Sequence, residues 1–218
     1  MKETFLVCAA VLALAAGAAG ADLEDDIADA IETFASDNFE LRFEAFRRIV
    51  EIGQPAAAQL IEVLSVDKVL VRSYACRALA GIGAPEARTP LQQTLENDDA
   101  ASVRAAAAEA LAAYNNAALD PLRKAASEDP VVYVRKSAAI AIASVHTKTA
   151  IDQLIWLLKG PDSEVGGIAA DGLREITRED FGTDSDAWKK WWTDNRADFE
   201  IQGETPADEA GGEEKQAP

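Results

Sequence analysis

Histidine and cysteine, which often act in catalysis or bind metals, are scarce in this 218-residue chain. His146 is the single histidine, and the two cysteines are Cys8 and Cys76. A zinc site or a cysteine–histidine nucleophile pair needs such residues close together in space. The spacing of these residues along the chain does not indicate that they are. The sequence therefore predicts no catalytic residue, no metal site and no cofactor.

Tryptophan is a better candidate for function, because tryptophan and arginine are frequent binding hot spots. Three of the four tryptophans lie close together, at Trp188, Trp191 and Trp192. Their spacing puts them on one face of a helix capped by Ser185 or Asp186, with Lys189 and Lys190 on the other face. Three exposed indoles would form an aggregation-prone patch. We therefore expect a structural cap, with an exposed aromatic binding site as the alternative.

The remaining tryptophan, Trp156, is predicted on the exposed side of a helix. Leu154 and Leu158 mark the buried side, and a turn of about 100° per residue puts Trp156 opposite their midpoint. The matching earlier places are polar: Glu62, Gln93 and Lys124. We predict a binding surface for a protein or peptide, formed by Trp156, Lys124, Arg123, Gln93 and Glu62. In the alternative, the C-terminal segment folds back over Trp156.

An internal repeat predicts the elements that position these residues. Apolar residues recur at i, i+4, i+8 and i+11 in five copies, which start 30, 32, 31 and 31 residues apart. This spacing is one face of a helix about three turns long. The second position is always alanine, which lets a neighbouring helix approach closely. The copies are Leu41, Ala45, Ile49, Ile52; Val71, Ala75, Leu79, Ile82; Val103, Ala107, Leu111, Tyr114; Val134, Ala138, Ile142, Val145; and Val165, Ala169, Leu173, Ile176.

A second helix follows each of the first four copies, as regularly spaced leucines indicate. One helical hairpin cannot bury its apolar stripe, whereas stacked hairpins share a continuous core. The sequence therefore predicts an all-α solenoid of helical hairpins. Terminal repeats need a cover, and an acidic helix carrying Leu23, Ile27, Ile31 and Phe34 is expected to cap the first hairpin, as the tryptophan helix caps the last.

Arginine follows the first apolar position in four copies, at Arg42, Arg72, Arg104 and Arg135. Aspartates precede these arginines by five residues at Asp37, Asp67 and Asp99, and by six at Asp129. Such an aspartate can cap the helix, and the arginine can reach a carboxylate or carbonyls of the adjoining repeat. We interpret the row as a structural ladder between repeats, because the arginines recur with the core; an anion-binding row is the alternative.

The N-terminus is typical of a secretory signal peptide: Lys2, an apolar run from Phe5 to Ala16, and small residues up to Ala21. The run is shorter than the roughly 20 residues that span a bilayer. We expect cleavage after Ala21, export to the periplasm or the extracellular space, and no stable membrane insertion. The net charge of −17 and the lack of basic runs argue against nucleic acid as a partner.

The expected organisation is a signal peptide over residues 1–21, a solenoid over 22–202 and a disordered acidic tail over 203–218. Within the solenoid, repeats are expected at about 37–66, 67–98, 99–128 and 129–161, with a partial repeat at 162–177 and a C-terminal cap at about 178–202.

The repeats resemble the HEAT-repeat family, in particular the short HEAT-like type first noted in phycobilisome lyases. The stretches "DKVLVRSYACRALAGIG" at 67–83 and "DAASVRAAAAEALAAY" at 99–114 carry the resemblance. The ending "DFG … W-x-x-W-W" is similar to that of exported bacterial HEAT-like proteins, although Arg178 and Glu179 depart from the usual pattern. The resemblance implies a right-handed superhelix with second helices on its concave side, and a family of protein-binding scaffolds with a few enzymes.

From these observations we predict a non-enzymatic exported scaffold or adaptor that binds a protein or peptide on its concave face. One alternative is a lyase- or isomerase-like HEAT protein that acts on a bulky ligand. The other is a purely architectural subunit of an envelope complex.

Overall fold

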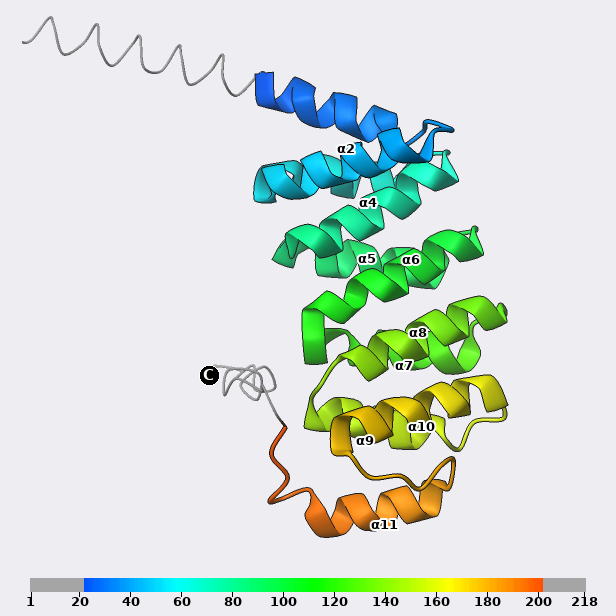
Figure 1. Ribbon diagram of the computed structural model, residues 1–218. Helices are drawn as coiled ribbons and strands as arrows, with labels where there is room; N and C mark the ends of the chain where they lie inside the picture. Colours follow the sequence, from blue (N-terminus) through cyan, green and yellow to red (C-terminus); the bar gives the residue numbers. More distant parts are fainter. Residues whose placement is uncertain (1–21, 202–218) are drawn as a thin grey trace, which may run out of the picture.

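The computed structural model describes residues 22–201, and this part of the chain contains helices and turns but no β-strand. The helices are stacked in pairs along one axis, from the N-terminal helix to α11 (Figure 1). The prediction of an all-α, right-handed solenoid with a capping helix at each end is confirmed. The predicted signal peptide over residues 1–21 and the predicted acidic tail over 203–218 lie outside the described residues.

Each repeat consists of a first and a second helix, and a helix over residues 22–33 precedes them. The first helices are α2 (Phe39–Ile52), α4 (Val69–Ile82), α6 (Ala101–Leu111), α8 (Val132–Ser144) and α10 (Ser163–Thr177). The second helices are α3 (Ala57–Glu62), α5 (Arg88–Asn97), α7 (Leu119–Glu128) and α9 (Lys148–Leu157), and α11 (Ser185–Asn195) ends the stack. Short 3-10 segments occur at Gln54–Ala56, Val63–Ser65, Pro85–Ala87 and Ala112–Ala118.

Small residues let the first helices pack closely, in the order α2, α4, α6, α8 and α10. The alanines at the second position of the last four copies are fully buried: Ala75, Ala107, Ala138 and Ala169. Where α10 crosses α8, a Cβ added to Gly172 would lie 2.6 Å from the Cβ of Ala143. The solenoid core therefore depends on close contact between helix backbones as well as on its buried leucines.

The first copy departs from the predicted core pattern at one position. Leu41 is 47% exposed, although its counterparts Val71, Val103 and Val134 are buried. Within the described residues, one helix rather than a full repeat precedes α2, and Leu41 borders a groove that it shares with Asp29 and other residues of that helix. The prediction that Leu41 is a core residue is therefore wrong, because half a repeat covers less surface than a whole one.

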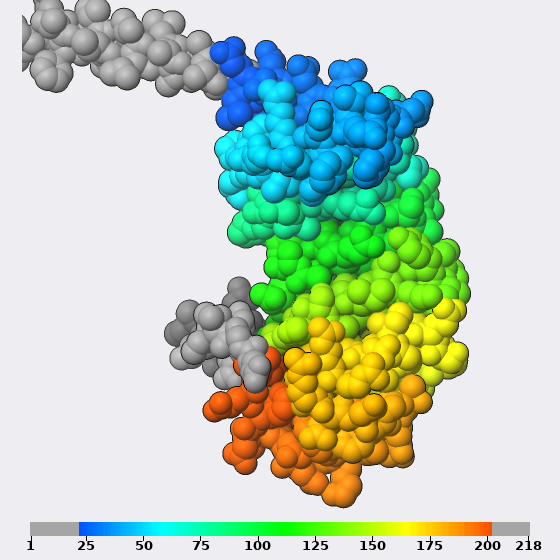
Figure 2. All heavy atoms as spheres, in the orientation of Figure 1, coloured from blue at the N-terminus to red at the C-terminus, as the bar shows by residue number. Residues whose placement is uncertain are grey.

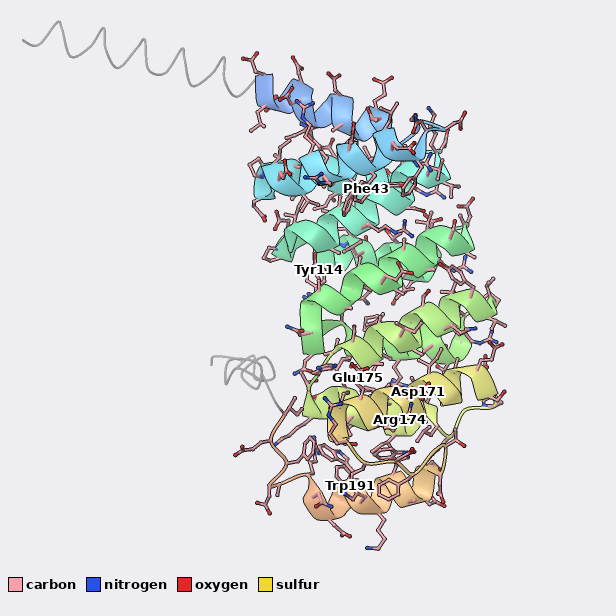
Figure 3. The ribbon with its side chains drawn as sticks, viewed as in Figure 1. Phe43, Tyr114, Asp171, Arg174, Glu175 and Trp191 are labelled. Carbon is pink, nitrogen blue, oxygen red and sulfur yellow. The ribbon has the colours of Figure 1, made fainter. Side chains whose placement is uncertain are left out.

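Aromatic residues cover both ends of the stack. At the start, Phe34 is fully buried, and its ring stacks on that of Tyr74 with centroids 5.2 Å apart. At the other end, Trp188 is fully buried and its indole Nε1 donates a hydrogen bond to the carbonyl of Gly182 at 2.8 Å. Figure 3 shows Trp191 on the side of α11 that faces the preceding repeat. Figure 2 shows the surface of this end, where α11 and the residues that follow it are orange to red.

The N-cap of the tryptophan helix differs from the prediction. The carboxylate of Asp184 accepts hydrogen bonds from the amides of Asp186 and Ala187, so it caps α11 in place of Ser185 or Asp186. Between residues 22 and 201, no helix is both long and apolar enough to cross a membrane.

Candidate functional site

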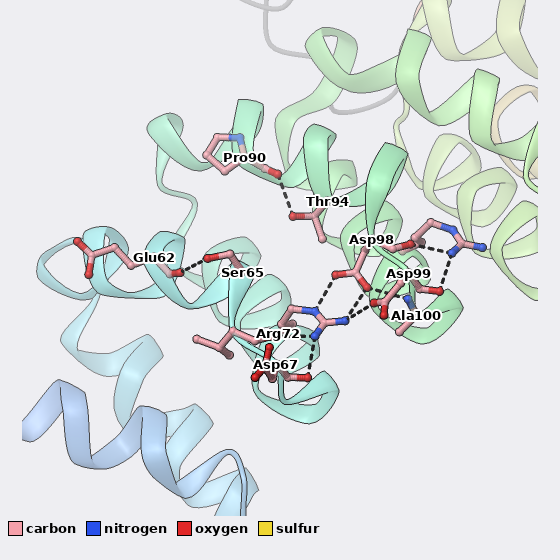
Figure 4. Close-up of polar contacts among 11 residues, drawn as sticks. Glu62, Ser65, Asp67, Arg72, Pro90, Thr94, Asp98, Asp99 and Ala100 are labelled. Carbon is pink, nitrogen blue, oxygen red and sulfur yellow. Dashed lines mark hydrogen bonds and ion pairs between the residues drawn. The ribbon is translucent and has the colours of Figure 1, made fainter.

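Three of the four predicted ladder arginines reach an aspartate of the next repeat. Arg72 contacts Asp98 with two nitrogens, at 2.7 and 2.8 Å, and Asp99 at 2.7 Å (Figure 4). Its third nitrogen, Nη1, donates to the carbonyls of Val66 and Asp67 at 2.8 and 3.0 Å. One guanidinium thus joins the start of its own helix to the start of the next first helix.

The same contact recurs in the next two repeats. Arg104 binds both oxygens of Asp129, at 2.8 and 3.1 Å, and Arg135 binds Asp162 at 2.6 Å. Arg42 differs, because its Nε donates to the hydroxyl of Tyr74 at 3.3 Å and no carboxylate among residues 22–201 pairs with it. The guanidinium groups are thus occupied by contacts within the protein. Few of their N–H donors remain to bind an external anion.

The aspartate that begins α6 lies one residue earlier than predicted. Asp98 accepts a hydrogen bond from the amide of Ala100 at 2.9 Å, whereas the carboxylate of Asp99 is exposed and pairs with Arg72. Burial opposes ionisation of Asp98, but hydrogen bonds from Arg72 and Ala100 outweigh it and lower the pKa of this carboxyl. Asp98 is therefore held as a carboxylate that serves both the helix and the ladder.

Trp156 lies on the outer side of α9, where 46% of its surface is exposed. The guanidinium carbon of Arg123, in α7, is 4.6 Å from the centroid of its ring, a cation–π distance. Arg123 therefore holds the indole in position from one side and leaves part of it open to solvent.

Trp156 forms part of the wall of a cleft of about 420 Å³ between α9 and α11. From α9 the cleft is lined by Asp152, Ile155 and Trp156, followed by Lys159; from α11 it is lined by Lys189, Trp192 and Thr193, followed by Arg196. The volume falls in the range of small-molecule sites, about 300 to 1,000 Å³. The cleft combines two indoles with several cationic groups.

Asp152 fixes the two walls of this cleft relative to each other. Its carboxylate accepts a hydrogen bond from the indole Nε1 of Trp192 at 2.7 Å and pairs with Arg196 at 2.8 Å. The side-chain ammonium groups of Lys159 and Lys189 have no hydrogen-bond or ion-pair partner among the described residues. Since Arg196 offsets Asp152, the two lysines leave the cleft with a net positive charge.

The other predicted surface residues lie away from this cleft. Lys124 lines a groove between α5 and α7, and Gln93 lines another between α3 and α5. Glu62 is exposed at the end of α3. The structure thus brings Arg123 to Trp156 and leaves Lys124, Gln93 and Glu62 in separate places along the second helices.

The lysines and Arg196 are the site residues that the sequence analysis missed. Lys159 follows Trp156 by three residues, a helical spacing that predicts the same side, and the structure places it just past the end of α9. Lys189 was assigned to the face opposite the tryptophans, yet it lines the cleft beside Trp192. Its contribution depends on how α11 is oriented against α9, which spacing along the chain does not determine.

Neither Cys76 nor His146 belongs to the cleft. Cys76 is fully buried, and burial raises the pKa of its thiol to about 12, so it is a poor nucleophile. His146 is exposed at the end of α8. Among residues 22–201, no group of three or more histidine, cysteine or acidic side chains could hold a metal ion.

Similar proteins include a lyase subunit and a solved complex. The phycocyanobilin lyase subunit beta of Pseudanabaena tenuis (strain PCC 7409) is 32% identical over 148 residues, which are 59% of this chain and 52% of that protein. The chain thus spans about half the length of this relative. The complex of CpcE and CpcF of phycocyanin lyase from Nostoc sp. PCC7120 has a chain with a TM-score of 0.59 and 23% identity, covering 67% of this chain and 96% of that one.

These similarities correct the functional prediction. The relative of 32% identity is named as a lyase subunit, so the prediction of a non-enzymatic scaffold or adaptor is wrong, and so is the prediction that the chain is not an enzyme. The alternative of a lyase-like HEAT protein that acts on a bulky ligand is favoured instead.

The family model for HEAT repeats matches residues 58–143 and 119–187, which together are more than half of the chain. The matched residues are those whose paired helices stack from α3 to α11. The resemblance of the repeats to the HEAT-repeat family is confirmed, and this chain belongs to that family.

Proposed function

We propose that this chain is a subunit of a lyase that acts on a bilin or a closely similar bulky, conjugated ligand. The observation that carries the proposal is the 32% identity over 148 residues to a phycocyanobilin lyase subunit. The cleft between α9 and α11 supports it, because an exposed indole beside unpaired cations suits a flat, charged organic molecule.

A lyase reaction adds a group to a double bond or eliminates one from it, and neither direction moves electrons to an outside acceptor. The protein therefore has to bind the ligand, orient it and exclude competing reactions. Trp156, Lys159 and Lys189 border the cleft and are placed to bind and orient the ligand. The buried thiol of Cys76 is not placed to attack the ligand, so the group that joins the ligand comes from the other reactant.

A second protein is part of the proposal. The relative is named as a subunit, and the structural neighbour was solved as a complex of two different proteins. A solenoid exposes a long surface on which another protein can bind. We therefore propose that the active species contains this chain and a second protein subunit.

Export is also proposed and rests on the leader predicted over residues 1–21. N-terminal sequencing of the protein recovered from envelope and extracellular fractions tests it. A mature chain that begins at Asp22 is expected, and an intact Met1 in the protein recovered from cells would contradict it.

The lyase proposal is tested first by ligand binding. Purified chain is titrated into phycocyanobilin while visible absorption and tryptophan fluorescence are recorded. We expect a changed chromophore spectrum together with quenching of tryptophan fluorescence. An unchanged spectrum with the protein in excess would overturn the proposal.

The reaction is tested by substituting the chain for either Nostoc protein of the CpcE and CpcF complex. Phycocyanobilin and chromophore-free phycocyanin are then added. Chromophore that stays on phycocyanin after denaturation, above the level seen with either Nostoc protein alone, is the expected result.

A further inference from the structure

The indole of Trp156 is exposed but held in place. Arg123 covers it at 4.6 Å on one side, while 46% of the side chain remains accessible on the border of the cleft. A fixed and partly bare indole offers a flat apolar surface, and aromatic rings prefer to stack on such a surface or to meet it edge-on. The wall formed by Trp156 therefore favours a ligand with a planar aromatic or conjugated part.

The net charge of the side chains around the cleft is positive, whereas the net charge of the chain is negative. The whole chain carries a net charge of −17. Lys159 on one wall and Lys189 on the other nevertheless stay without an acidic partner among the residues described. Two unpaired ammonium groups that border one cleft are suited to a carboxylate of the ligand.

We propose that the cleft between α9 and α11 binds a planar conjugated molecule through Trp156 and holds a carboxylate of that molecule with Lys159 and Lys189. This inference rests on the proposed function, since it assigns the ligand of the lyase to one site. It adds the chemistry of recognition: a flat ring against the indole and an anionic group between the lysines.

The geometry limits how much of a ligand is held. The cleft is open to solvent along one side, and its two walls come from α9 and α11. The hydrogen bond and ion pair of Asp152 with Trp192 and Arg196 fix those walls before a ligand arrives. A preformed, one-sided cleft of about 420 Å³ accepts one end of an extended molecule and leaves the remainder accessible to a second protein.

The experiment uses probes that separate ring stacking from charge. The full chain is titrated with pyrene-1-carboxylate, with its methyl ester and with phycocyanobilin, and binding is followed by fluorescence. The variants are Trp156→Ala and the double variant Lys159→Gln/Lys189→Gln. Lys190→Gln is the matched control, because Lys190 lies on the same helix but pairs with Asp194 at 2.7 Å.

Each variant has its own expected effect. Trp156→Ala should weaken binding of all three probes by about thirtyfold or more, as for a central anchor. The double lysine variant should weaken binding of the two anionic probes by about tenfold and leave the ester unchanged. Lys190→Gln should match the parent chain. Thermal unfolding of each variant checks that it folds. If Trp156→Ala fails to fold, the double lysine variant still tests the inference, because both lysines are exposed and their replacement should not disturb the fold.

The results distinguish this inference from the proposed function. If phycocyanobilin binds equally to the parent and to both cleft variants, the inference is overturned and the lyase proposal stands. If pyrene-1-carboxylate binds with the expected dependence and phycocyanobilin does not bind, the cleft chemistry stands and the bilin assignment fails. Equal binding of the acid and its ester to the parent chain would also overturn the inference.

Discussion

Burial divides the arginine ion pairs of this chain into two groups. The side chains of Arg104 and Asp129 are 11% and 6% exposed, whereas those of Arg47 and Glu51 are 63% and 71% exposed. A buried carboxylate that loses its partner stays poorly hydrated, while an exposed one is hydrated by water. Loss of one partner should therefore cost far more in the ladder than on the surface.

We expect Arg104→Met to lower the free energy of unfolding by about 3 kcal/mol, because it leaves the carboxylate of Asp129 buried without its partner. Arg47→Met is the control, and it should cost less than about 1 kcal/mol. Urea unfolding followed by far-ultraviolet circular dichroism measures both. Equal losses in the two variants would show that burial does not determine the strength of these contacts.

Asp162 should make stability depend on pH. The hydrogen bond from Arg135 lowers the pKa of this carboxyl below its ordinary value of 3.8. A carboxyl with a lower pKa in the folded state stabilises the fold at every pH above its unfolded pKa, and this contribution is lost as the pH falls through the folded pKa. Acidification should therefore lower the stability of the fold.

Comparison with Asp162→Asn isolates this contribution from the other acidic residues. We expect the variant to be less stable than the parent at neutral pH and the difference to shrink as the pH falls below about 4. Urea unfolding at a series of pH values measures it. A difference that stays constant down to about pH 2.5 would mean that the charge of Asp162 is not what stabilises the fold.

At the scale of the helices, periodicity predicted most of the fold and little of the detail at helix ends. The i, i+4, i+8 pattern suffices for the buried faces of α4, α6 and α8, because helix geometry converts spacing directly into direction. It does not specify whether Asp98 or Asp99 accepts the amide of Ala100 at the start of α6, since such contacts depend on backbone angles at a single residue. The exposure of Leu41 depends on how far the N-terminal helix reaches, which the spacing also does not specify.

Two glycines of α10 should respond in opposite ways to alanine. In Gly172→Ala the new methyl would meet Ala143 of α8 at 2.6 Å, so the helices must move apart. We expect a loss of roughly 1 to 3 kcal/mol, as for an overpacked core. A Cβ at Gly167 meets no atom within 4 Å, and Gly167→Ala should gain about 0.5 to 1 kcal/mol from helix propensity.

Thermal and urea unfolding of these two variants measure the difference directly. Both positions lie in the same helix, so propensity alone predicts that both variants gain stability. A gain at Gly172 would mean that α8 and α10 are not held as close together as their backbones indicate.

At the scale of the whole molecule, the cleft could not be predicted from the sequence. Helix geometry placed Trp156 on an outer face, but its neighbours Trp192 and Arg196 belong to a helix that contacts α9 only in the folded stack. The bond from Trp192 to Asp152 joins residues 40 positions apart. Such contacts are set by how a whole element docks, and no spacing within either helix encodes them.

The shared core predicts how the whole stack unfolds. Each first helix packs against the next, from α2 to α10, so no repeat has a core of its own. Neighbouring repeats should therefore unfold together. We expect one cooperative transition by circular dichroism, with the same midpoint when tryptophan fluorescence is followed. Two separated transitions would contradict a single continuous core.

Removal of the C-terminal cap should destabilise the whole stack rather than one end. A chain truncated after Thr177 loses Trp188 and Trp192, which are 0% and 5% exposed in the intact protein, and uncovers the apolar surface that they bury. We expect aggregation, binding of a hydrophobic dye and a lower unfolding midpoint, because a terminal repeat without its cover exposes its core. A chain that lacks only residues 203–218 is the control and should match the parent. If the truncated chain instead stays monomeric and equally stable, the tryptophans of α11 serve the cleft alone and the last repeat needs no cap.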